Sequence, residues 1–252
     1  MAAALVQSKT GEGIDPTVTF DASVTSGNLV EVTCNQGDDA NTLTFVVTDN
    51  KGNTYLTNAT TLRSTGASGT VIQKFYIYNV VGGASFAVSV DQSVNTNPIA
   101  VTIAEFSGVE TAADPLDKTA EGTNTNTTPI TGSSGTLSQA DELVTYAVGS
   151  RLAALQTADP TAAGFDRFAT QTTTGEWGAQ SAHYKVVAAT TAVAGDGALA
   201  NQTWVTVLAT YKAGTAAAAA DHGLSALMDA EILGGGGFVN RGLHQVEHGI
   251  CA

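Results

Sequence analysis

Charged side chains are scarce in this chain of 252 residues, since Asp, Glu, Lys and Arg together make up 13% of it. Most soluble surfaces carry many of these residues, and here Thr, Ser, Asn and Gly take their place. Positive charge is the rarest, because 10 Lys and Arg stand against 23 Asp and Glu, which gives a net charge of −13. Such a chain repels a phosphate backbone, so we expect no nucleic-acid partner.

Cysteine is almost absent: Cys34 and Cys251 are the two in the chain, too few for a disulfide framework. No run approaches the roughly 18 consecutive apolar residues that a membrane-spanning helix needs, so we expect no membrane partner. Residues 1–9 lack a basic stretch followed by an apolar one, and we expect no secretion signal.

What the sequence does contain is a succession of short alternating runs between residues 17 and 212. In one of them Val30, Val32 and Cys34 alternate with Glu31 and Thr33, the pattern of a strand with one face on a core. Similar runs occur at residues 43–47, 86–90 and 99–103. Gly- and Asn-rich turn signals separate them. The sequence therefore predicts an all-β, two-sheet antiparallel β-sandwich of the jelly-roll or immunoglobulin-like class.

Two stretches of this region stand out. The run 204–211 is apolar on both faces, which predicts a central strand covered on both sides. Residues 119–138 are almost entirely Thr, Asn, Ser and Gly, which cannot fill a core. We expect this second stretch to form a long exposed loop or a junction between subdomains, and we favour a single domain.

The two ends differ from the sandwich region. Residues 1–16 are expected to form an extended N-terminal arm, and residues 213–252 an Ala/Gly-rich tether with a C-terminal assembly tail. Within the tail, residues 224–233 fit a short amphipathic helix that tetraglycine ends. The apolar side chains predicted to bind a partner are Leu224, Leu227, Met228, Ile232, Leu233 and Phe238.

Several segments together carry a family likeness. They are GNLV (27–30), VTDNKGNTY (47–55), YIYNVVGG (76–83), IAEFSGV (103–109) with PLD (115–117), and ADELV (140–144). In this order they resemble a β-sandwich module of phage virion structural proteins and uncharacterised bacterial surface proteins. The likeness covers roughly residues 17–212. It implies a structural or adhesive module and transfers no catalytic residue.

The sharpest match to a catalytic motif is His244-Gln-Val-Glu-His248, which fits the inverted zinc-protease pattern His-x-x-Glu-His. The motif follows tetraglycine and leaves almost no downstream sequence for a further ligand. We therefore predict no metalloprotease and no metal cofactor. A structural metal held by His244 and His248, with Cys251 or His222 as a further ligand, is the alternative to a plain tail.

Oxygen ligands for Ca²⁺ could come from Asp49, Asn50 and Asn53, with residues 38–39 nearby. The same residues fit an ordinary hairpin turn in which Gly52 adopts a positive φ. We favour the turn over the calcium site.

Acid and base catalysis would need two carboxylates close together, and Glu105 and Glu142 each lie at the end of a predicted strand. Nothing in the sequence brings them together. Ser107 lacks the Gly-x-Ser-x-Gly context of a hydrolase nucleophile. We therefore predict that the chain is not an enzyme.

A sugar-stacking platform could use Trp177, Tyr184 and Trp204, although core packing explains most aromatic residues. Trp177 is the exception, because it lies in a Thr- and Gly-rich stretch typical of an exposed loop. It is the predicted glycan contact of a tail or cell-surface receptor-binding module, our alternative function.

The predicted function is that of a bacteriophage virion structural protein, a capsid decoration or head-surface protein that works without cofactors. Its partners would be other virion proteins, namely the major capsid protein or neck and tail proteins. Repeated copies on a shell present repeated sites, so we expect a homo-oligomer.

Overall fold

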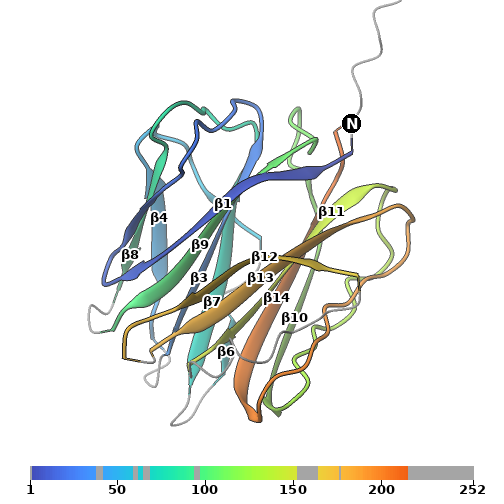
Figure 1. Cartoon of the computed structure of the whole chain (residues 1–252). Helices are drawn as coiled ribbons and strands as arrows, with labels where there is room; N and C mark the ends of the chain where they lie inside the picture. The colour runs from blue at the N-terminus through green and yellow to red at the C-terminus, as the bar shows by residue number, and fades with distance from the viewer. Residues whose placement is uncertain are drawn as a thin grey trace, which may run out of the picture. The chain divides into compact units, whose positions relative to one another are not determined.

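The computed structural model describes residues 2–37, 42–58, 62–64, 69–93, 97–151, 164–175 and 177–214. Within these ranges the protein consists of antiparallel strands and contains no helix. No helix that could cross a membrane is therefore found in the part of the chain described. The strands form three sheets (Figure 1).

The sheet that we call the central sheet has six strands in the order β1-β9-β3-β7-β5, with β6 also paired to β7. Its strands are β1 (Ala4–Gly13), β3 (Leu29–Gly37), β5 (Leu56–Thr57), β6 (Leu62–Ser64), β7 (Thr70–Ile77) and β9 (Ile99–Ser107). The small sheet contains β2 (Thr17–Thr19), β8 (Ala87–Gln92) and β4 (Phe45–Asp49). The five-stranded sheet contains β10 (Leu116–Asn126), β14 (Gln202–Tyr211), β11 (Glu142–Ser150), β13 (Ala179–Val187) and β12 (Asp166–Thr172), in that order.

Both faces of the central sheet are covered. All nine residues of β3 are buried, and so are all eight of β7. Toward the small sheet, Val30 and Val32 share an apolar cluster with Phe45 and Val88. Toward the five-stranded sheet, Leu29 packs in a second cluster with residues of β11 and β14. In Figure 1 the small sheet lies on the left and the five-stranded sheet on the right of the central sheet.

The predicted all-β antiparallel sandwich is thus confirmed, with three stacked sheets in place of two. The strand expected to be central, residues 204–211, lies within β14 between β10 and β11. Nine of the ten residues of β14 are buried, as a strand with apolar side chains on both faces requires.

The stretch 119–138 is only in part the exposed loop that was expected. Its first part continues β10 to Asn126, and the rest runs over the outer face of the five-stranded sheet beside residues 188–201. The two segments exchange backbone hydrogen bonds, from Thr131 N to Gly195 O at 2.9 Å and from Ser134 N to Val193 O at 2.8 Å. We call residues 127–138 and 188–201 the covering segments.

The covering segments bury the apolar outer face of this sheet. Leu137, Val193 and Leu199 pack with Tyr146 and Trp204. The Tyr146 hydroxyl donates a hydrogen bond to Pro129 O at 3.0 Å. Few apolar residues suffice here because the backbone groups of the segments find partners in each other and in the sheet.

The expectation of a free N-terminal arm at residues 1–16 is wrong. Residues 4–13 form β1, which pairs with β9 along its whole length at the edge of the central sheet. The backbone groups of these residues are therefore satisfied within the chain. Ser8 Oγ also donates a hydrogen bond to Phe168 O in β12 at 3.1 Å.

At the other end, the described body reaches Gly214, two residues beyond the predicted boundary. The predicted tether, helix and tail lie outside the described residues, with the exception of residues 213 and 214. The six predicted partner-binding residues lie outside them as well: Leu224, Leu227, Met228, Ile232, Leu233 and Phe238.

Candidate functional site

A cluster of polar side chains lies between the central sheet and the five-stranded sheet. Glu31 on β3 and Lys74 on β7 form an ion pair, with 2.6 Å between Lys74 Nζ and Glu31 Oε1. The Lys74 side chain has no exposed surface and that of Glu31 is 2% exposed. Burial of two charges is costly unless each has good partners, so the other neighbours of this pair matter.

The second carboxylate oxygen of Glu31 receives hydrogen bonds from both layers. Thr145 Oγ1 on β11 donates to Oε2 at 2.6 Å, and the Tyr211 hydroxyl on β14 donates to it at 2.8 Å. Lys74 Nζ also donates to Thr145 Oγ1 at 2.8 Å. The five-stranded sheet therefore supplies the hydroxyl groups that compensate the buried charge on the central sheet.

Asn58, the residue after β5, completes the cluster. Its Nδ2 donates to the Tyr211 hydroxyl at 2.8 Å and lies 3.5 Å from Glu31 Oε2. Its Oδ1 is buried and accepts no hydrogen bond from the described residues. Asn58 and Lys74 face each other across the strand pair, since Asn58 N donates to Lys74 O at 3.4 Å.

Burial dominates the protonation of this cluster. Loss of water lowers the pKa of Lys74, an effect that the negative charge of Glu31 opposes. Burial, together with the charge of Glu31, raises the pKa of Tyr211 well above its ordinary value, so the phenol stays neutral and donates. Burial thus pushes Lys74 toward its neutral form, the form in which an amine is a nucleophile.

This cluster was not predicted from the sequence. One signal was available: Lys74 interrupts the apolar run from Val71 to Ile77 and shares a face with Ile72 and Tyr76. Lysine is almost never fully buried unless it is paired. Asn58 could not be recognised as a site residue from the sequence, because it lies in a stretch rich in Thr and Asn.

The predicted glycan contact, Trp177, is half-buried rather than exposed. The guanidinium carbon of Arg151 lies 4.5 Å from the centre of its indole ring, so one ring face is covered by a cation. The backbone carbonyl of Trp177 accepts a hydrogen bond from Gly37 N. The other two aromatic residues considered for sugar stacking, Tyr184 and Trp204, pack in apolar clusters.

The candidate calcium ligands form a turn, as favoured, but the turn joins β4 of the small sheet to β5 of the central sheet and is therefore not a hairpin. Asp49 Oδ1 accepts hydrogen bonds from Lys51 N at 2.8 Å and Asn53 N at 3.2 Å, and Asp49 Oδ2 accepts one from Asn53 Nδ2 at 2.9 Å. Gly52 has a φ of 78°, as the turn predicts. Among the residues that the structure describes, no three His, Cys, Asp or Glu side chains come together as metal ligands would.

Glu105 and Glu142 lie in different sheets, each with its own donors. Glu105 accepts hydrogen bonds from Gln7 Nε2, Thr25 N and Asn28 Nδ2 at 2.6, 2.8 and 2.6 Å. Glu142 accepts one from a backbone N–H at 3.2 Å, and burial raises its pKa. The structure does not make them a catalytic pair. The histidine motif at residues 244–248, like His222 and Cys251, lies outside the described residues.

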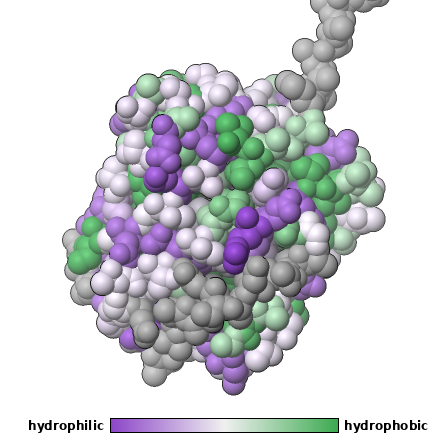
Figure 2. Space-filling model, viewed as in Figure 1, coloured by the Kyte–Doolittle hydropathy of each residue, from purple (hydrophilic) through white to green (hydrophobic). Residues whose placement is uncertain are grey.

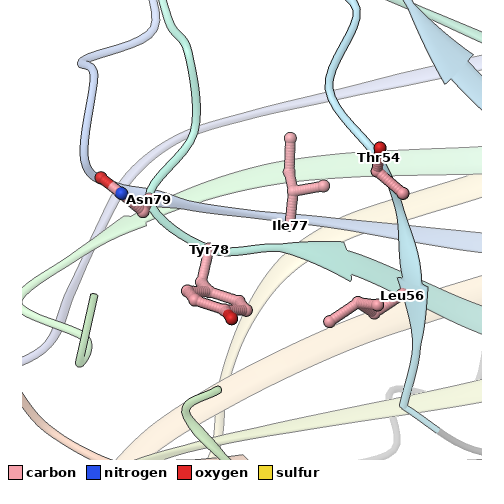
Figure 3. A pocket seen from close by; sticks show the side chains of 5 residues that line it. All are labelled: Thr54, Leu56, Ile77, Tyr78 and Asn79. Atoms are coloured by element: carbon pink, nitrogen blue, oxygen red, sulfur yellow. The ribbon is translucent and has the colours of Figure 1, made fainter. Parts of the chain in front are cut away.

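A pocket of about 340 Å³ opens at the ends of β5 and β7. Its lining residues are Thr54, Leu56, Ile77, Tyr78 and Asn79, shown as sticks in Figure 3. The side chains of Ile77, the last residue of β7, and of Tyr78, which follows it, point to opposite sides of the chain (Figure 3). No charged side chain and no strong nucleophile lines this pocket, so its chemistry suggests no reaction.

Comparison of the chain with protein-family models, with curated protein sequences and with solved structures found no match. The resemblance to a phage virion module therefore stays a prediction.

Proposed function

We propose that this chain is a non-catalytic structural protein of a bacteriophage particle, a decoration protein of the head surface. The body stands on the particle, and the segment beyond Gly214 attaches it to neighbouring virion proteins. The observation that carries this proposal is the position of the two ends of the body, which meet at one place on its surface.

Gly108, in the turn after β9, is where the ends meet. A side chain there would collide with the backbone of residues 2 and 3. On its other side Gly108 O accepts a hydrogen bond from Gly214 N at 2.8 Å. Figure 1 shows the N-terminus next to the end of the last coloured segment. The described body therefore ends, at Gly214, beside the place where the chain begins.

Attachment through one end leaves the opposite end of the body free to project from the shell. The apolar side chains after Gly214, including Leu227 and Leu233, supply area for burial against a partner. On the face shown in Figure 2, hydrophobic residues form small groups among weakly polar and strongly hydrophilic ones. The net charge of −13 favours a place outside the shell, away from packaged DNA.

The test compares particles assembled with the full chain and with a variant that ends at Gly214. We expect the shortened chain to fold, because its sheets are complete, and to be lost from particles purified on a density gradient. Replacement of Leu227 and Leu233 by Ser should give the same loss. The matched control is Val46→Ser, which changes an apolar side chain 58% exposed on the small sheet and should leave incorporation intact. Full incorporation of the shortened chain would refute the proposal.

A further inference from the structure

Three reactive groups of different kinds meet in the buried cluster: the amine of Lys74, the amide of Asn58 and the carboxylate of Glu31. The carboxylate contacts both of the others, with Oε1 at 2.6 Å from Lys74 Nζ and Oε2 at 3.5 Å from Asn58 Nδ2. A buried ion pair that needed only the hydroxyl groups of the five-stranded sheet as further partners would not require the amide.

The register of the central sheet fixes this arrangement. Thr57 pairs with Phe75, so the next residue, Asn58, lies opposite Lys74. On the other side of β7, Thr33 pairs with Lys74, and Glu31 is diagonal to it on the same face. Side chains of directly opposed residues on adjacent strands lie on one face and within reach of each other. The amide and the carboxylate therefore flank the amine from the two neighbouring strands.

The surroundings suit a reaction between the amine and the amide. All three side chains are buried, so water does not compete as a nucleophile. Burial lowers the pKa of Lys74, which favours the neutral amine. The short hydrogen bond to Glu31 provides the path by which the ammonium proton leaves. The fixed geometry supplies the proximity that an amide otherwise lacks as an acyl donor.

We propose that Lys74 and Asn58 join in an intramolecular isopeptide bond, with Glu31 as the proton carrier. Lys74 Nζ attacks Cγ of Asn58 and forms a new C–N bond, and the bond from Cγ to Nδ2 breaks. The Glu31 carboxyl group, which has taken a proton from the ammonium group, gives it to the departing nitrogen and receives another from Nζ. One ammonia molecule leaves, and no oxidant or further reactant is needed.

The product ties the segment after β5 to β7 beneath the five-stranded sheet. The strand β5 is only two residues long, so hydrogen bonds alone hold it weakly. A covalent link would fix this edge of the central sheet independently of the function proposed above.

Intact-mass spectrometry of the purified full-length chain tests the proposal directly. We expect a mass below that of the sequence by one ammonia molecule. After trypsin digestion, residues 52–63, which contain Asn58, should be covalently joined to the peptide that contains Lys74, with no cleavage after Lys74. A wild-type protein of full sequence mass, with a free peptide 52–63, would overturn the proposal whatever the variants do.

Variants then assign the roles. Lys74→Arg and Asn58→Ala should each have the full mass calculated from the variant's own sequence, with no loss of ammonia. Glu31→Gln should also have its full calculated mass, because it removes the proton carrier. The matched control is Asn28→Ala, since Asn28 Nδ2 donates to Glu105 at 2.6 Å in an amide–carboxylate pair to which no lysine of the described residues is hydrogen-bonded. This control should keep the ammonia loss. Persistence of the loss in Asn58→Ala would show that it arises elsewhere in the chain, and the proposal would be wrong.

Discussion

Gly122 on β10 allows a direct test of the covering segments. A Cβ atom at this position would collide with the carbonyl group of Ile130 and would lie 2.8 Å from Thr206 Oγ1. Gly122→Ala must therefore push residues 127–138 away from the sheet. Gly132, within the same segment, is the matched control, because the nearest atom to its Cβ would be Glu121 O at 3.6 Å, an ordinary contact.

The size of the effect follows from two contributions. Overpacking a well-packed site costs about 1–3 kcal/mol. Displacement of the segment also loses backbone hydrogen bonds, such as that from Gly132 N to Glu121 O at 2.8 Å, each worth about 1 kcal/mol. We expect Gly122→Ala to lower the free energy of unfolding by about 2–4 kcal/mol. Gly132→Ala should leave it unchanged or raise it by about 0.4–1 kcal/mol.

Urea unfolding followed by tryptophan fluorescence is a suitable assay, because Trp204 lies beneath the covering segments. Trp204 is 2% exposed, and its Nε1 donates a hydrogen bond to Asn126 Oδ1 at 3.0 Å. A Trp177→Phe background leaves Trp204 as the single reporter. Gly122→Ala should lower the urea midpoint and shift the emission of the folded state to the red. Equal midpoints for the two alanine variants would refute the idea that residues 127–138 form a fixed layer.

Two further predictions concern Glu142 and Trp177. Burial raises the folded-state pKa of Glu142 above its ordinary 4.5, so this group favours folding at low pH and that contribution is lost as the pH rises through the folded pKa. Glu142→Gln should therefore raise the melting temperature at pH 7 and have little effect near pH 4 in a thermal scan; a loss of stability at pH 7 would contradict the assignment. Trp177→Ala should lower the unfolding free energy by about 0.5–1 kcal/mol through loss of the contact with Arg151 and leave a glycan-array profile unchanged. Glycan binding by the wild type that this variant abolishes would instead favour the receptor-binding alternative.

The sandwich was predictable because its apolar residues alternate. On β3, Val30, Val32 and Cys34 indicate a strand with a buried face, and that face packs on the small sheet. The third sheet was not predictable from β3, since Glu31 and Thr33 are typical of a face that water covers. Their burial depends on partners far along the chain, such as Tyr211, which is 180 residues from Glu31.

The candidate site was unpredictable for a related reason. The local alternation of residues in the sequence shows which side chains share a face of a strand, but it does not show what covers that face. Lys74 stood out in an apolar run, while Asn58 and Thr145 were two among many polar residues of a Thr- and Asn-rich sequence. The covering segments were missed because backbone hydrogen bonding, rather than apolar content, holds them on the sheet.

The order of the sheets along the chain has a consequence for synthesis on the ribosome. Every strand of the central and small sheets lies within residues 4–107, and the five-stranded sheet follows within residues 116–211. The first two sheets can therefore pair and fold while the rest of the chain is still being made. The face that then waits for its cover carries Glu31, Thr33 and Lys74 among its apolar residues, and these groups keep it hydrated and resistant to aggregation until the last sheet docks.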